Sequence, residues 1–214
     1  MDNNNVYLFY PNLIGYGRII LAIASFWYMS TSPVCAMFCY ALSAALDAFD
    51  GWAARTYNQS SRFGAMLDQL TDRCALLALV MALCKFYPNW LFSLQMTAVI
   101  DIASHWLHLH ATDLTKQTSH KQSSNPILHL YYTDRLFLGF MCAGNEAFYL
   151  FLYIRAFFPG PTILGAHLMS YLAAIAFPIA FVKAAISLVH LFSAAQTVVS
   201  HDIALRINSP PKKE

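Results

Sequence analysis

Four aspartates at helical spacing are the residues of this sequence best suited to chemistry. Asp47 and Asp50 are three residues apart in one apolar stretch, and Asp68 and Asp72 are four apart in the next. In helices, each pair shares one face, because residues three and four apart are neighbours. Carboxylate oxygens suit Mg²⁺ or Mn²⁺, and four of them neutralise two divalent cations. The pattern predicts a two-metal site of the kind that supports phosphoryl transfer.

Glycines and an arginine accompany these aspartates. Gly51 follows Asp50 directly, and Gly64 precedes Asp68 by one helical turn. Both leave bare backbone where a phosphate or nucleotide can approach closely. Arg55 stands one turn beyond Gly51, and its planar guanidinium matches the geometry of a phosphate. These neighbours favour a phosphorylated substrate.

The elements that must position these residues are those of a membrane protein. The chain has 214 residues, 58% of them apolar and 11% charged, against roughly 45–50% and 25% in a soluble domain. A membrane helix needs about 20 mainly apolar residues. We predict an all-α, polytopic membrane protein, formed as a single domain over residues 1–214 with a core at 7–195 and polar tails at 1–6 and 200–214. Its six transmembrane helices are expected at Asn12–Met29, Val34–Ala54, Gly64–Lys85, Trp90–Leu109, Leu136–Phe157 and Gly165–Phe192.

Polar residues and prolines set the expected boundaries. The polar stretch Thr112–Asn125 predicts a long loop before the fifth helix, and Pro178 predicts a kink in the sixth. Residues 1–5 lack the basic region of a signal peptide, so we expect the first apolar segment to remain as a membrane helix.

The basic residues predict the orientation. With six spans both termini share one side, and only Lys85 and Arg155 are assigned to the other. By the positive-inside rule, the termini and the aspartate site are cytoplasmic. The net charge of +2, without a large basic cluster, argues against a nucleic-acid partner. The basic residues on the side of the termini are Arg18, Arg55, Arg62, Arg73, Lys116, Lys121, Arg135, Arg206, Lys212 and Lys213.

Energetics require the four aspartates to face the interior of the helix bundle. An ionised carboxylate at the bilayer centre costs about 2.5–3.5 kcal/mol, so four facing lipid would cost on the order of 10 kcal/mol, comparable with the stability of a domain. The short connection Arg55–Phe63 makes their two helices antiparallel neighbours. Two unit charges about 5 Å apart repel by about 3 kcal/mol at an effective dielectric of 20, so the converging faces need cations.

The same residues carry a family resemblance. The pattern D-x2-D-G-x2-A-R-x8-G-x3-D-x3-D, running from Asp47 to Asp72, matches the signature of the CDP-alcohol phosphotransferase family at every fixed position. The resemblance implies a six-helix membrane enzyme, usually a homodimer, that cleaves a CDP-linked lipid or alcohol and passes the phosphoryl-bearing part to a hydroxyl.

The resemblance also implies roles for individual residues. Asp47, Asp50, Asp68 and Asp72 would hold two divalent cations, with Asp68 bridging them. Asp72 would also accept the proton of the attacking hydroxyl. The residues implied to bind the CDP moiety are Gly51, Arg55 and Ser61.

Further stretches resemble the branch of this family that makes phosphatidylinositol in eukaryotes. This implies that CDP-diacylglycerol and myo-inositol react to give phosphatidylinositol and CMP, among the lipids of the endoplasmic reticulum membrane. The stretches are Pro11–Tyr16, Leu46–Gly51, Arg62–Asp68, Ala103–His110 and Cys142–Glu146.

Polar residues outside the signature are candidates for binding the acceptor. Asp101, His105, Asn145 and Glu146 could form a polar wall that hydrogen-bonds inositol hydroxyls. Arg135 is a further candidate, which could instead contact a lipid phosphate or serve only to anchor the topology. Structural pairing between helices, with Arg18 or Arg135 as partner, is the alternative. We interpret His105, His108 and His110 as interfacial or hydrogen-bonded side chains rather than a zinc site.

Two alternative functions stay open at this point. One is a transferase of the same family with glycerol 3-phosphate, serine, or choline or ethanolamine compounds. The other is a cation transporter that uses the intramembrane carboxylates, which the cytoplasmic placement of the aspartates and the lack of a repeat disfavour.

Overall fold

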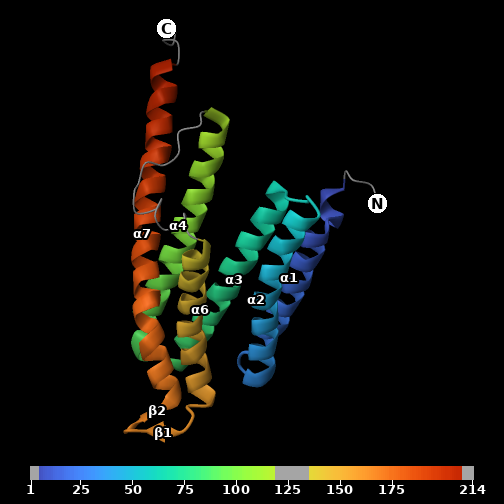
Figure 1. Ribbon diagram of the computed structural model, residues 1–214. Helices are drawn as coiled ribbons and strands as arrows, with labels where there is room; N and C mark the ends of the chain where they lie inside the picture. The colour runs from blue at the N-terminus through green and yellow to red at the C-terminus, as the bar shows by residue number, and fades with distance from the viewer. Residues whose placement is uncertain (1–4, 119–134, 209–214) are drawn as a thin grey trace. The chain divides into compact units, whose positions relative to one another are not determined.

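A computed structural model describes residues 5–118 and 135–208, and over these the chain is predominantly helical (Figure 1). Short 3-10 turns at Val6–Leu8 and Pro88–Trp90 precede the first and fourth long helices. Apart from one short two-stranded hairpin, the helical fold is therefore confirmed for the described part of the chain. Its long helices are α1 (Tyr10–Tyr28), α2 (Pro33–Thr56), α3 (Arg62–Phe86), α4 (Leu91–Thr118), α6 (Arg135–Phe157) and α7 (Leu168–Asn208).

Each long helix overlaps one of the six predicted segments. In the described ranges, α2, α6 and α7 are long and apolar enough to cross a membrane. Charged side chains interrupt α3, among them Asp68, Asp72 and Arg73, and lower its apolar character. These lengths and compositions are those of an integral membrane protein, and six crossings stay a prediction.

Two helices run further than predicted. The fourth continues to Thr118, so the first residues of the expected loop Thr112–Asn125 are helical, and its residues 119–125 lie outside the described part. Thr112 Oγ1 donates to the carbonyl of His108 at 2.8 Å, which satisfies this polar side chain within the helix. The last helix continues through Pro178 to Asn208, so residues 200–208 of the expected tail are helical, and the kink stays a prediction.

A small hairpin precedes α7 and delays its start from the expected Gly165 to Leu168. Strand β1 (Thr162–Ile163) pairs antiparallel with β2 (Ala166–His167). Leu164 and Gly165 join them with φ angles of 47° and 89°. Positive φ at both residues is the geometry of a tight two-residue hairpin loop.

The chain divides into two compact units. The first contains the residues up to Leu94 together with Tyr149–Met169. In it, Ser25 Oγ donates to the carbonyl of Ala36 at 2.9 Å and so ties α1 to α2. Tyr153 donates its hydroxyl to the carbonyl of Met29 at 2.9 Å. The core of this unit includes Ala22, Ala36, Tyr40, Leu76, Leu79, Val80 and Leu83.

The second unit contains Gln95–Phe148 and the chain from Ser170 onward. Its helices α6 and α7 approach closely at Gly144, where an added Cβ would lie 2.7 Å from Ile179. Its interior holds several buried polar side chains among the apolar ones: Asp101, Ser104, Asn145, Lys183, Ser187 and His190.

Candidate active site

The turn between α2 and α3 sets the geometry of the aspartate site. Asn58 has φ 51°, a left-handed conformation that asparagine tolerates, and ends α2. The N–H of Gln59 then returns to the carbonyl of Ala54 at 2.9 Å, as in a Schellman cap. Ser61 starts α3 by accepting the Gly64 N–H on its Oγ at 3.0 Å. Capping at both ends makes α2 and α3 antiparallel with their aspartates at the same end.

The aspartates of the two helices converge. One carboxylate oxygen each of Asp47, Asp50 and Asp68 lies within 4.8 Å of the other two. These are hard oxygen donors at a spacing that one small cation can bridge, which fits Mg²⁺ or Mn²⁺. Asp72 joins the group through a shared partner, Arg18.

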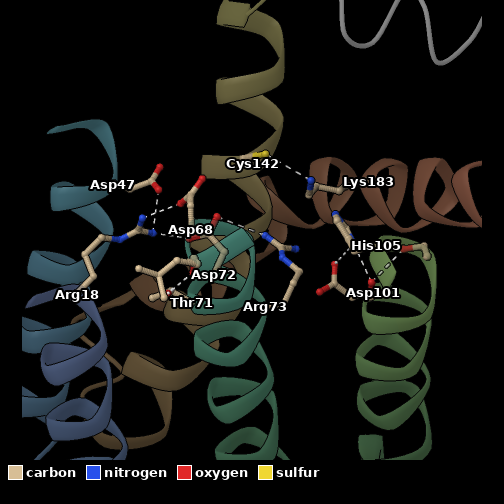
Figure 2. Close-up of polar contacts among 12 residues, drawn as sticks. Arg18, Asp47, Asp68, Thr71, Asp72, Arg73, Asp101, His105, Cys142 and Lys183 are labelled. Atoms are coloured by element: carbon tan, nitrogen blue, oxygen red, sulfur yellow. Dashed lines mark hydrogen bonds and ion pairs between the residues drawn. The ribbon is translucent and has the colours of Figure 1, made fainter. Parts of the chain in front are cut away.

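Arg18 of α1 lies among the four carboxylates, and Figure 2 shows it beside Asp47, Asp68 and Asp72. Its Nη1 donates to Asp50 Oδ2 at 2.6 Å and to Asp68 Oδ1 at 2.7 Å. Its Nη2 lies 2.8 Å from Asp47 Oδ1 and 2.6 Å from Asp72 Oδ1. Sequence reasoning missed this position of Arg18, which it considered only for orientation and as a structural partner of acidic residues elsewhere. The signal in the sequence was that Arg18 is the one charged residue of the apolar helix α1. An arginine in such a helix is expected to be buried and to pair with carboxylates.

The arginine and the aspartates of this cluster differ in the exposed fractions of their side chains. The side chain of Arg18 is 2% exposed, whereas those of Asp47 and Asp68 are 45% and 44% exposed. The carboxylates of Asp47 and Asp68 are therefore accessible from outside, whereas the Arg18 guanidinium and Asp50 are buried. Arg73 adds a second cation, with its Nη2 3.8 Å from Asp72 Oδ2, so four carboxylates and two guanidinium groups leave a formal charge of −2. Two carboxylates about 5 Å apart repel each other by about 3 kcal/mol. Because the cluster keeps a net negative charge, binding of further cations is electrostatically favourable.

A pocket of about 160 Å³ adjoins the aspartates. Asn12 is one of several lining residues for which the sequence predicted no role, although it lies in Pro11–Tyr16, which carried part of the resemblance. Its Nδ2 donates to the carbonyl of Val6 at 2.6 Å, while its buried Oδ1 has no hydrogen-bond partner in the described residues. The pocket is lined by Pro11, Asn12, Gly15, Asp50, Gly51, Ala54, Gln59, Ser60, Ser61, Gly64, Ala65, Leu67 and Asp68.

The predicted CDP-binding residues lie at or beside this pocket. Gly51 and Ser61 line it, and the hydroxyl oxygen of Ser61 is engaged in capping α3. Arg55 is exposed and lies outside the wall, with its Nη1 3.4 Å from the position that a Gly51 Cβ would take. The guanidinium is thus adjacent to the bare backbone of Gly51, as the spacing predicted.

The candidate acceptor residues belong to the second unit. Asp101 is buried, and His105 Nδ1 lies 2.7 Å from its carbonyl oxygen and 3.5 Å from its Oδ1. Asn145 is buried in α6 and Glu146 is half-buried. Arg135 is the first residue of α6, and its side chain lies outside the described part.

Two polar residues of α7 were not singled out from the sequence. Lys183 is buried, with Nζ 3.4 Å from Cys142 Sγ. His190 stacks on His108 with ring centroids 5.0 Å apart and an interplanar angle of 6°. The two stacked rings connect α4 to α7 within the second unit. An ionisable residue in an apolar helix is the signal that could have identified Lys183.

Comparisons with known proteins identify the family of the chain. The family model described as CDP-alcohol phosphatidyltransferase matches residues 8–199. A Drosophila melanogaster protein named CDP-diacylglycerol--inositol 3-phosphatidyltransferase is 46% identical over 100% of this chain and 95% of its own length. A Homo sapiens protein of the same name is 46% identical over 96% and 98%. One from Saccharomyces cerevisiae is 43% identical over 72% and 71%. No solved structure gives a significant match.

Proposed function

The chain belongs to the CDP-alcohol phosphatidyltransferase family, and from this we propose that it transfers the phosphatidyl group of CDP-diacylglycerol to myo-inositol, giving phosphatidylinositol and CMP. The observation that carries the proposal is the 46% identity over the whole chain to a relative named for this reaction. The names of the relatives favour inositol over glycerol 3-phosphate, serine, choline or ethanolamine compounds. They also favour a transferase over a cation transporter.

Asp47, Asp50, Asp68 and Asp72 would hold two divalent cations, Mg²⁺ or Mn²⁺, and the family resemblance implies that Asp68 would be shared between them. Support comes from the oxygen donors of Asp47, Asp50 and Asp68, which lie within 4.8 Å of one another, and from the partial exposure of Asp47 and Asp68. When bound, the cations stabilise negative charge that develops on the attacking and leaving oxygens.

The pocket beside the aspartates receives part of the CDP moiety. Gly51 and Gly64 leave room for it, and Arg55 supplies a cation for a phosphate from just outside the wall. Ser61 contributes its hydroxyl hydrogen, because its oxygen already caps α3. Asn12 adds an acceptor, since its buried Oδ1 has no partner among the described residues.

Asp72 is the proton acceptor of the reaction. Its side chain is 34% exposed, so a hydroxyl can reach the carboxylate. As Asp72 takes the hydroxyl proton, the inositol oxygen forms a bond to the phosphorus that carries diacylglycerol. The bond from that phosphorus to the bridging oxygen breaks, and CMP leaves with the electron pair. No covalent intermediate with the protein is required.

Asp101, His105, Asn145, Glu146 and Arg135 bind inositol. Support comes from the burial of Asp101 and Asn145 in apolar helices, where polar side chains are costly and usually serve a function. Carboxylate, amide and imidazole groups can together donate to and accept from the hydroxyls of an uncharged polyol.

We place the protein in the endoplasmic reticulum membrane, with six crossings and with both termini and the aspartate site on the cytoplasmic side. The distribution of lysine and arginine supports this orientation. A homodimer is the assembly that the family resemblance implies.

The decisive experiment measures CMP release by the purified full-length protein in detergent with CDP-diacylglycerol. We expect release only when both myo-inositol and Mg²⁺ or Mn²⁺ are present. Release supported by glycerol 3-phosphate or serine in place of inositol would assign another acceptor. Absence of release with every acceptor, together with cation flux in vesicles, would point to transport.

A further inference from the structure

Arg18 connects the two helices of the aspartate site through both ends of its guanidinium. Nη1 pairs with Asp50 of α2 and Asp68 of α3, and Nη2 pairs with Asp47 of α2 and Asp72 of α3. The four distances, 2.6–2.8 Å, are those of strong charge-assisted hydrogen bonds. One side chain thus uses an oxygen of every carboxylate in the site.

The backbone of α1 fixes the guanidinium in this place. The carbonyl of Arg18 accepts a hydrogen bond from Ser43 Oγ of α2 at 3.1 Å, and both residues are buried. The side chain of Arg18 is 2% exposed while three of the four aspartates are open to solvent. The arginine therefore reaches the carboxylates from within the protein, whereas an ion from solution reaches them from outside.

We propose that Arg18 is an internal counter-cation of the site: it holds the four carboxylates together without divalent cations and competes with those cations for them. A guanidinium and a divalent cation on the same oxygens repel each other, so loading weakens the contacts of Arg18. Arg18 is in this sense a positioning residue that acts through the aspartates. The inference rests on the proposed function only in taking these aspartates as metal ligands.

The alternative is that Arg18 merely packs and pairs, as any buried arginine must. The two accounts differ in how the effect of its removal depends on metal. If Arg18 and the divalent cations neutralise the same carboxylates, loss of Arg18 lowers the stability of the protein strongly in EDTA and much less in the presence of Mn²⁺. If it merely packs, the loss is the same under both conditions.

The experiment compares wild type and Arg18→Gln, both full-length and purified in detergent with Mn²⁺ before dialysis against EDTA. Thermal unfolding is measured in EDTA and in saturating Mn²⁺, and Mn²⁺ affinity is measured by electron paramagnetic resonance. We expect Tm of the variant to fall by about 10 °C in EDTA and most of this loss to disappear in Mn²⁺. By linkage, the variant must then bind Mn²⁺ tighter, by about tenfold for each of the two cations.

Three further variants keep the result interpretable. Arg62→Gln removes an exposed arginine from the first turn of α3 and should change neither Tm nor affinity. The double variant Arg18→Gln/Asp47→Asn removes one of the repelling charges and should regain part of the Tm lost in EDTA. Arg18→Lys keeps the charge without the fork and should lie between wild type and Arg18→Gln, which gives a readout even if the latter unfolds in EDTA.

Equal losses of Tm in EDTA and Mn²⁺, or an Mn²⁺ affinity of Arg18→Gln at or below wild type, would overturn the inference. Failure of the proposed metal site looks different, because wild type itself would then bind no Mn²⁺ and release no CMP.

Discussion

Asn12 of α1 and Gly64 of α3 meet so closely that a Cβ on the glycine would lie 2.7 Å from Asn12 Oδ1. The hydrogen bond from Asn12 Nδ2 to the carbonyl of Val6 restrains the asparagine side chain. It therefore has little freedom to retreat. This contact fixes the width of the pocket beside Asp50 and Asp68.

Gly64→Ala should for this reason narrow the pocket and destabilise the protein. Overpacking costs about 1–3 kcal/mol, partly offset by about 1 kcal/mol of improved helix propensity. We expect a lower Tm and a raised KM for CDP-diacylglycerol. Gly17→Ala in α1 is the matched control, because no atom lies within 4 Å of its added Cβ. A Gly64→Ala protein that behaved like Gly17→Ala would show that Asn12 moves aside freely.

Ser61→Ala tests the start of α3. The change removes the oxygen that accepts the Gly64 N–H, and loss of such a cap costs about 0.5–2 kcal/mol. We expect a reduced Tm, and because the substitution changes neither chain length nor net charge, the reduction reports the loss of the cap. Ser60→Ala is the control, since the hydroxyl of Ser60 makes one long contact of 3.5 Å in an exposed turn. Equal Tm values for the two variants would remove the capping role.

Much of this site follows from the sequence, because its geometry is local. The spacing of Asp47, Asp50, Asp68 and Asp72 fixes which residues share a helix face, and the short turn brings the two faces together. Arg18 is different, because its partners lie 29 to 54 residues away along the chain. Which face of α1 meets α2 is decided by packing, so spacing alone could not predict the four ion pairs.

The helix ends, too, could be predicted only in part from the sequence. Apolar length predicts the part of a helix that could lie in lipid, and it underestimates α4 and α7, which continue into polar sequence. Polar helical turns are stable there because side chains such as Thr112 bond within their own helix. The hairpin at 162–167 is too short to leave a pattern of alternation.

Removal of divalent cations should abolish CMP release, and Mg²⁺ or Mn²⁺ should restore it.

Among the aspartates, Asp68→Asn should weaken Mn²⁺ binding more than Asp47→Asn, because a ligand shared by two cations would contribute to the binding of both. Mn²⁺ titration of the purified variants measures this order directly. An inverted order would assign the shared position to another aspartate.

Asp72→Asn should abolish turnover while leaving binding of CDP-diacylglycerol largely intact. A general base contributes about 10²–10⁴-fold to rate, so a loss of at least about 100-fold is expected. Turnover is measured as CMP release, and binding as the rise in Tm that CDP-diacylglycerol produces. Near-native turnover would remove Asp72 from the role of proton acceptor.

Asp101→Asn and Glu146→Gln should raise the KM for inositol more than the KM for CDP-diacylglycerol. The amides keep the size of the side chains but lose the charge-assisted bonds to hydroxyls, each worth about 1.5–3 kcal/mol, so the KM for inositol should rise roughly tenfold or more. Asp113→Asn is the matched control, because Asp113 is an exposed carboxylate on the same helix as Asp101. Equal rises in both KM values, with a lowered Tm, would instead assign Asp101 and Glu146 to structural pairing, because loss of packing does not distinguish the two substrates.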